Sequence, residues 1–161
     1  MGKKSIKENK NIYFQSREEA GLTRAQASEA MEYVSESRIE KIETGKVTVH
    51  PEDVVAMADA YKKPNLCNYF CANECRIGQD YVPEIKLSSL SEIALGLLSS
   101  LNALDKEKER IIDITEDGQI SDDELEDFYA IKDRLEKLSL TIDSLNLWVD
   151  QAIADKKLKE K

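Results

Sequence analysis

The chain has 161 residues, of which 41% are hydrophobic and 34% are charged, and it contains only three prolines and six glycines. This length suits one ordinary domain or a small domain with an appendage, and the composition is typical of a helix-rich protein. No run approaches the roughly 18 apolar residues that a membrane span needs, and no signal peptide is visible. We therefore expect a cytoplasmic protein without a membrane partner.

The net charge of −9 is concentrated in the second half of the chain. Residues 81–161 hold 11 Lys and Arg against 19 Asp and Glu, whereas residues 1–80 hold 12 against 13. A surface that binds nucleic acid is therefore expected only in the first half. Even there, the basic excess that usually accompanies phosphate binding is missing.

The first third of the chain predicts four short helices separated by turns. Gly21 follows the first helix, Thr23 is the expected N-cap of the second, and Ser35 is the expected N-cap of the third, which ends at Gly45. Pro51 opens the fourth helix, at a position where proline is well tolerated. Helices this short do not persist alone in water, so they must pack on each other.

The order of these features resembles the helix-turn-helix domain of phage repressors and of the wider XRE (lambda-repressor-like) family of bacterial regulators. The resemblance rests on Arg17 with Gly-Leu-Thr at 21–23, and on Arg-Ile-x-x-Ile-Glu-x-Gly-Lys at 38–46. It covers residues 11–61 and implies an all-α, lambda-repressor-like domain, which we place at 8–64. By the same resemblance, the protein is a transcriptional regulator that binds double-stranded DNA in a sequence-specific way.

The resemblance also implies roles for individual residues, because such domains insert their third helix, here about 35–43, into the major groove. The implied base-facing residues are Glu36, Ser37, Lys41 and Arg38, the last of which can face a base or a phosphate. The implied phosphate contacts are Arg24, Thr44 and Lys46. Arg17 and Glu43 match a partly buried structural ion pair, and Ile39 and Ile42 are expected to face inward.

Two features depart from the family pattern. Between Ser28 and Ser35 the family has a short turn with a glycine, whereas this chain has no glycine and one extra residue there. The third helix also carries Glu36 and Glu40, which repel phosphate unless Glu36 accepts from a cytosine amino group. A second hypothesis is therefore a protein-interaction adaptor whose helix-turn-helix fold no longer binds DNA.

The rest of the chain predicts a long antiparallel, coiled-coil-like helical hairpin at 87–161, after a Cys-containing helix and linker at 65–86. Apolar residues recur with heptad spacing in two rows, which are Leu87, Leu90, Ala94, Leu97, Leu101 and Leu104, and then Phe128, Ile131, Leu135, Leu138, Ile142, Leu145, Val149 and Ala152. Further apolar residues beside both rows make the stripe too wide for two helices to bury. We expect the hairpin to form a homodimer, with folding back on the first domain as the alternative.

Three cysteines lie four residues apart, at Cys67, Cys71 and Cys75. Thiolates at one helix face can hold zinc or an iron–sulfur cluster, but this spacing is not a common metal signature. Buried thiols that pack a helix explain the pattern more simply. We therefore predict no metal there.

The segment Asp113–Glu124 has oxygen-bearing residues at the spacing of an EF-hand calcium loop. A plain turn at Asp117-Gly118, followed by a capping box from Ser121 to Glu124, uses the same residues without a metal. We favour the turn. The sequence contains no catalytic constellation, so we expect neither an enzyme nor a cofactor.

Overall fold

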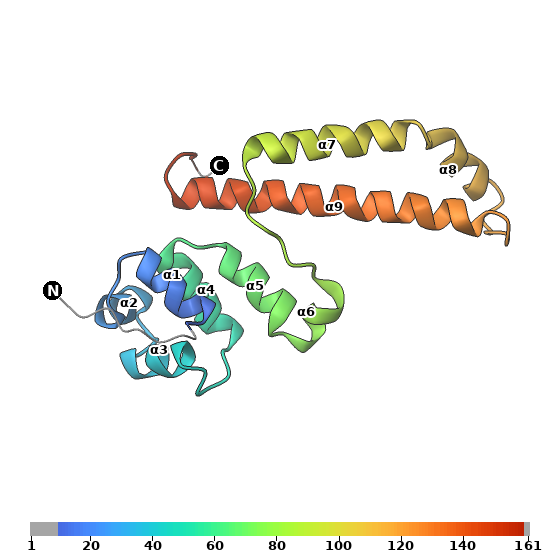
Figure 1. Ribbon diagram of the computed structural model, residues 1–161. Coiled ribbons are helices and arrows are strands. Elements are labelled where there is room, and N and C mark those ends of the chain that lie inside the picture. The colour runs from blue at the N-terminus through green and yellow to red at the C-terminus, as the bar shows by residue number, and fades with distance from the viewer. Residues whose placement is uncertain (1–9, 160–161) are drawn as a thin grey trace. The chain divides into compact units, whose positions relative to one another are not determined.

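The computed structural model describes residues 10–159, which form nine helices and no strand (Figure 1). The predicted all-α fold with a long C-terminal hairpin is confirmed. The described residues divide into two compact units. One unit runs to Glu84 and also contains the residues from Asp150 onward, and the other comprises Ile85–Val149.

The first unit is built from short helices in the order that the sequence predicts. They are α1 Ile12–Glu19, α2 Arg24–Met31, α3 Glu36–Glu43, α4 Pro51–Tyr61, α5 Asn65–Asn73 and α6 Arg76–Tyr81. Side chains cap several of their N-termini. Thr23 and Gln26 form a reciprocal capping box at α2, and the hydroxyl of Ser35 accepts from the backbone N–H of Arg38 at α3.

Residues with positive φ make several turns between these helices. Gly21 follows α1 with φ +71° and Gly45 follows α3 with φ +66°, a conformation that glycine adopts without strain. Between α2 and α3 no glycine is available, and Glu32 takes φ +58° instead. The extra residue of this turn is thus accommodated by one non-glycine residue at positive φ, which is uncommon.

The core of the first unit is a single cluster of buried side chains. It contains Tyr13, Ala27, Met31, Val34, Ile39, Ile42, Val49, Val54, Ala56, Met57, Ala58, Tyr61, Leu66 and Phe70. Tyr13 of α1 also meets Tyr69 of α5 edge to face, with ring centroids 6.4 Å apart. This packing holds α3 in place by its inner face and leaves its outer face to solvent.

The three cysteines lie where α5 and α6 meet. All three are half-buried free thiols against the edge of the core, and burial raises the pKa of the Cys67 thiol. A Cβ on Gly78 would overlap the carbonyl oxygen of Cys71, so α6 approaches α5 as closely as it does because residue 78 is glycine. Within residues 10–159, no three His, Cys, Asp or Glu side chains are grouped as metal ligands.

The second unit is a helical hairpin in which α7, Leu90–Asp105, lies antiparallel to α9 (Figure 1). The helix α9 runs from Leu125 to Ala154, and its residues up to Val149 belong to this unit. At about 1.5 Å per residue, the 30 residues of α9 span about 45 Å. The first arm is not one continuous helix as expected. It breaks at Glu107, which has φ −109° and ψ 1°, and a separate α8 follows at Lys108–Thr115.

At the break, Glu107 leaves the helical conformation and forms an ion pair with Arg134 of α9. Beyond it, Ile114 of α8 is fully buried. At the turn, Gly118 has φ +70° and the Glu124 carboxylate accepts from the backbone N–H and the hydroxyl of Ser121. Among the helices of residues 10–159, none is both long enough and apolar enough to cross a membrane.

Candidate nucleic-acid interface

The helix α3 has one buried face and one exposed face. Ile39 and Ile42 are 0% and 1% exposed and anchor the helix to the core, as expected. Glu36, Ser37, Glu40 and Lys41 are all exposed on the other side. The side chains that could reach a partner are therefore one lysine, one serine and two carboxylates.

Glu43, at the end of α3, lies between two arginines. Its carboxylate accepts from Arg17 Nε at 2.5 Å and Arg17 Nη2 at 3.2 Å, and from Arg24 Nε at 2.8 Å. The Glu43 side chain is 1% exposed, so this cluster ties α3 to α1 and to the start of α2 from inside. Burial alone lowers the pKa of Arg17, but hydrogen bonding to Glu43 and the charge of Glu43 outweigh it and raise the pKa.

Arg38 of α3 makes a two-pronged ion pair with Asp53 of α4. Arg38 Nε donates to Asp53 Oδ1 at 2.8 Å, and Nη2 donates to Oδ2. The same carboxylate accepts from the backbone N–H of His50 at 3.1 Å and so caps α4. Burial raises the pKa of Asp53, but the bonds from Arg38 and His50 reverse this, and the net pKa is lowered. Arg38 thus braces α3 against α4.

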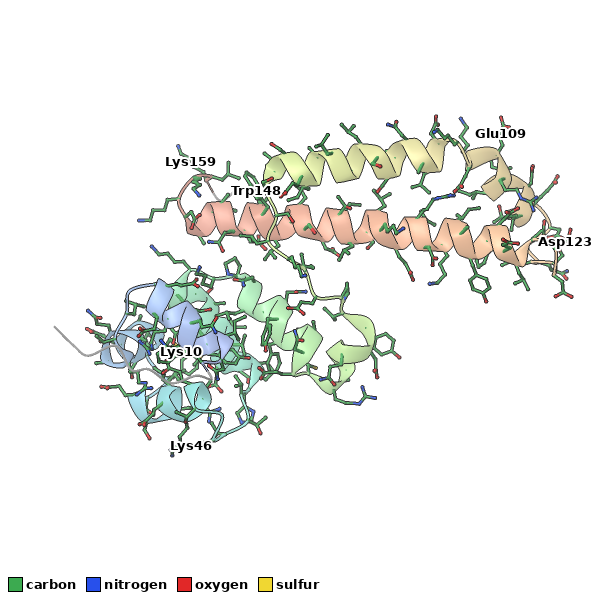
Figure 2. The ribbon with its side chains drawn as sticks, viewed as in Figure 1. Lys10, Lys46, Glu109, Asp123, Trp148 and Lys159 are labelled. Atoms are coloured by element: carbon green, nitrogen blue, oxygen red, sulfur yellow. The ribbon has the colours of Figure 1, made fainter. Side chains whose placement is uncertain are left out.

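The turn after α3 presents the remaining predicted phosphate contacts. The N–H of Gly45 donates to Ile42 O at 3.0 Å and that of Lys46 donates to Lys41 O at 2.8 Å, which is the bond pattern of a Schellman motif. The hydroxyl of Thr44 donates to Glu40 O at 2.7 Å. Thr44 and Lys46 are exposed, and Figure 2 labels Lys46 in this turn.

The charges of this surface nearly cancel. The charges of the exposed Lys41 and Lys46 are balanced by those of the exposed Glu36 and Glu40. The charge of Arg38 is balanced by that of Asp53. The Glu43 cluster is balanced in the same way, because Arg17 Nη1 also pairs with Glu18 Oε1 at 2.9 Å, so two guanidinium groups meet two carboxylates. Arg17 is buried, whereas 34% of the Arg24 side chain is exposed.

Two residues that shape this surface were absent from the sequence-based prediction. Asn11 caps α1 through Oδ1, and its Nδ2 donates to Ile42 O at 2.7 Å, which fixes the end of α3. Asp53 holds Arg38. The spacing of His50 to Asp53 at a helix start is a capping-box pattern and signals the cap of α4, but it gives no sign of the pair with Arg38.

A family model described as a helix-turn-helix domain matches residues 15–64 of this chain. The match begins within α1 and ends shortly after α4, so it covers the surface described above. No curated protein and no solved structure gives a significant match. The chain therefore carries a helix-turn-helix domain, a class that points to DNA binding.

Proposed function

We propose that this protein is a cytoplasmic, sequence-specific DNA-binding regulator of transcription, of the XRE type, which acts as a homodimer. The domain at 8–64 reads DNA with α3 in the major groove, and the hairpin at 87–161 dimerises, with the Cys-containing helix and linker at 65–86 between them. The observation that carries this proposal is the two-faced α3. Its inner face is locked by Ile39 and Ile42, and its outer face is free to meet a groove.

The proposed contacts divide into two kinds. Glu36, Ser37 and Lys41 face bases, and Arg38 supports them while it remains paired with Asp53. Arg24, Thr44 and Lys46 contact phosphates, which fix the register of the protein on the duplex. Among these, Arg24 is held in place by Glu43 and keeps 34% of its side chain exposed.

Dimerisation is part of the proposal because one short helix makes few base contacts. Two copies joined through their hairpins place two recognition helices on one duplex, and the second binding event becomes intramolecular. Half-sites about one DNA turn, roughly 34 Å, apart are then expected. The leucines that the hairpin leaves exposed support this arrangement, since a second copy would cover them.

Selection from a library of random-sequence duplexes tests this function. The purified chain should enrich a defined motif, and the exposed-site variant Lys41→Glu should lose the enrichment while keeping its helical content. If the unmodified chain enriches no motif, the protein is not a sequence-specific reader.

The second hypothesis, an adaptor with an inert helix-turn-helix fold, is favoured by one observation. Glu36 and Glu40 are both exposed on the outer face of α3, where a phosphate backbone would repel them. A protein partner with a basic surface would accept the same face. This hypothesis gains if the library selection fails and α3 variants instead weaken a protein complex.

A further inference from the structure

The acidity of the hairpin lies at one end of it. Residues 105–127, here named the tip, hold 11 Asp and Glu against three Lys and Arg. The remaining residues of the hairpin unit, 85–104 and 128–149, hold four of each and are neutral. Figure 2 shows Glu109 and Asp123 at the tip and Trp148 at the opposite end of this unit.

The register of the two arms can be read from their contacts. A Cβ on Gly96 of α7 would meet Thr141 of α9 at 3.6 Å, and Arg110 Nε donates to Asp127 Oδ2 at 2.7 Å. Both pairs fit one antiparallel register. In that register Leu101 lies level with Leu135, and Ala94 lies level with Ile142.

These residues share one side of the hairpin. At about 100° per residue, Leu101 and Leu98 lie about 40° and 100° around α7 from the inward-facing Leu97. Leu135 and Ile142 lie about 60° and 40° around α9 from Leu138, in the same rotational sense. When two helices are antiparallel, residues that are rotated in the same direction from the line of contact lie on the same side of the pair.

The result is one exposed apolar face that crosses both arms. It consists of Leu90, Ala94, Leu98 and Leu101 of α7 with Leu135 and Ile142 of α9. The four leucines and Ile142 are 44–57% exposed. Contiguous apolar surface of this kind marks an interaction site. The face lies entirely in the neutral part of the hairpin.

We infer that this face binds the same face of a second copy with the two hairpins side by side and antiparallel, so that the acidic tips point away from each other. The inference rests on the proposed function only in taking the chain to be a dimer. A two-fold axis that passes near Gly96 and Thr141 packs the neutral, apolar part of one copy against the same part of the other. The alternative, with tips together, would place two segments of net charge −8 side by side.

The charge distribution favours a second copy over an unrelated partner. The face is neutral and self-complementary, which a closed two-fold interface requires. A basic helix from another protein would be drawn to the tip and away from this face. At physiological salt, charges are screened over about 8 Å. Two tips that lie side by side would therefore repel each other, whereas tips at opposite ends of the dimer would not.

Cross-linking of the full chain at its native lysines tests the orientation. Equal amounts of unlabelled and ¹⁵N-labelled protein are mixed, and only mixed-isotope peptides count as links between copies. The inferred dimer should give links between Lys86 of one copy and Lys132 of the other, because both then lie at the same level. Links from Lys106 to Lys106, or from Lys108 to Lys108, would show the tips together and overturn the inference.

Sedimentation of two matched variants tests the face itself. Leu98→Glu should convert the dimer to a monomer, whereas Leu140→Glu should not, because Leu140 is 38% exposed on the far side of α9. A dimer that survives Leu98→Glu, or a monomeric unmodified chain, would overturn the inference. A monomer that still enriches a DNA motif would overturn this inference and the dimer part of the proposed function, while sequence-specific DNA binding would stand. A dimer that enriches no motif would overturn sequence-specific DNA binding and leave this inference standing.

Discussion

At the scale of single residues, Glu43 organises the face that we propose meets DNA. It fixes the last turn of α3 and at the same time holds Arg24 with its guanidinium partly exposed. An arginine held by a buried carboxylate loses little side-chain entropy when it binds a phosphate. The cost of this arrangement is that any phosphate must share Arg24 with Glu43.

Lys41 and Lys46 are both exposed lysines, yet they should have different effects on DNA affinity. Lys41→Ala should relax the preference at particular base pairs by about 1–3 kcal/mol, because Lys41 faces base edges in the proposed complex. Lys46→Ala should weaken all duplexes alike and reduce the salt slope by about 1. Titrations of matched duplexes at several salt concentrations separate the two effects.

Lys137→Ala is the matched control for these two substitutions, because Lys137 is an exposed lysine of α9, outside the helix-turn-helix domain. It should leave both affinity and salt slope unchanged. If Lys41→Ala behaves like Lys137→Ala, the assignment of Lys41 to base reading is wrong.

Tyr61 should make the fold sensitive to alkaline pH. Its hydroxyl is buried without a hydrogen-bond partner among the described residues, and burial, followed by the charge of Glu43, raises its pKa. In the unfolded chain the tyrosine ionises near pH 10, whereas in the folded chain it stays neutral. The unfolded state therefore binds fewer protons, and the free energy of unfolding should fall as pH rises above about 10.

The Tyr61→Phe substitution removes this group without removing its ring. At neutral pH it should leave the free energy of unfolding within about 1 kcal/mol of the original or raise it, because no hydrogen bond is lost. Above about pH 10 it should lessen the fall in stability. Urea unfolding at several pH values measures both effects, with Tyr81→Phe, at an 81% exposed site, as the control. A large loss at neutral pH would mean that the hydroxyl has a partner.

Sequence reasoning predicted which residues of α3 face inward but not which carboxylates pair with Arg24 and Arg38. The inward positions follow from helical periodicity, which is a local property. Arg38 and Asp53 are 15 residues apart in two different helices. Their pairing depends on how those helices pack, and nothing in the local pattern specifies that. Arg24 and Arg38 were therefore predicted as DNA contacts, without their partners Glu43 and Asp53.

At the scale of elements, two glycines within helices should respond oppositely to the same substitution. Gly78→Ala should destabilise the first unit by about 1–3 kcal/mol, because the added Cβ would overlap the Cys71 backbone. Gly96→Ala should stabilise the hairpin by about 0.5–1 kcal/mol, because its Cβ would only touch Thr141 at 3.6 Å and alanine favours helix. Thermal unfolding of both variants measures the difference. Equal effects of the two substitutions would contradict the packing of α6 on α5.

The order of the short helices could be predicted because their caps are local sequence signals. Thr23 and Ser35 cap α2 and α3 as expected, and Gly45 ends α3 in the left-handed conformation. The break between α7 and α8 could not be predicted in the same way. No glycine or proline marks it, and Glu107 leaves the helix where it meets Arg134 from the other arm.

At the scale of the whole molecule, the chain combines a weakly acidic helix-turn-helix domain, with 8 Lys and Arg against 11 Asp and Glu in residues 8–64, with an acidic hairpin whose charge lies at its tip. The first feature explains why total charge is a poor guide to function here, since affinity would depend on a few placed side chains. The second would keep the hairpin away from phosphate and would disfavour loose binding elsewhere on DNA. Both features follow from where the charges lie along the chain.

The most direct measurement is a titration of the purified chain onto a library-enriched duplex and onto a shuffled duplex of equal composition, at roughly 50 and 200 mM salt. We expect weaker binding to both duplexes at the higher salt, with the preference for the enriched duplex retained, because base contacts by α3 do not release counterions. Equal binding to both duplexes that disappears at the higher salt would contradict sequence-specific reading and would leave only phosphate contact.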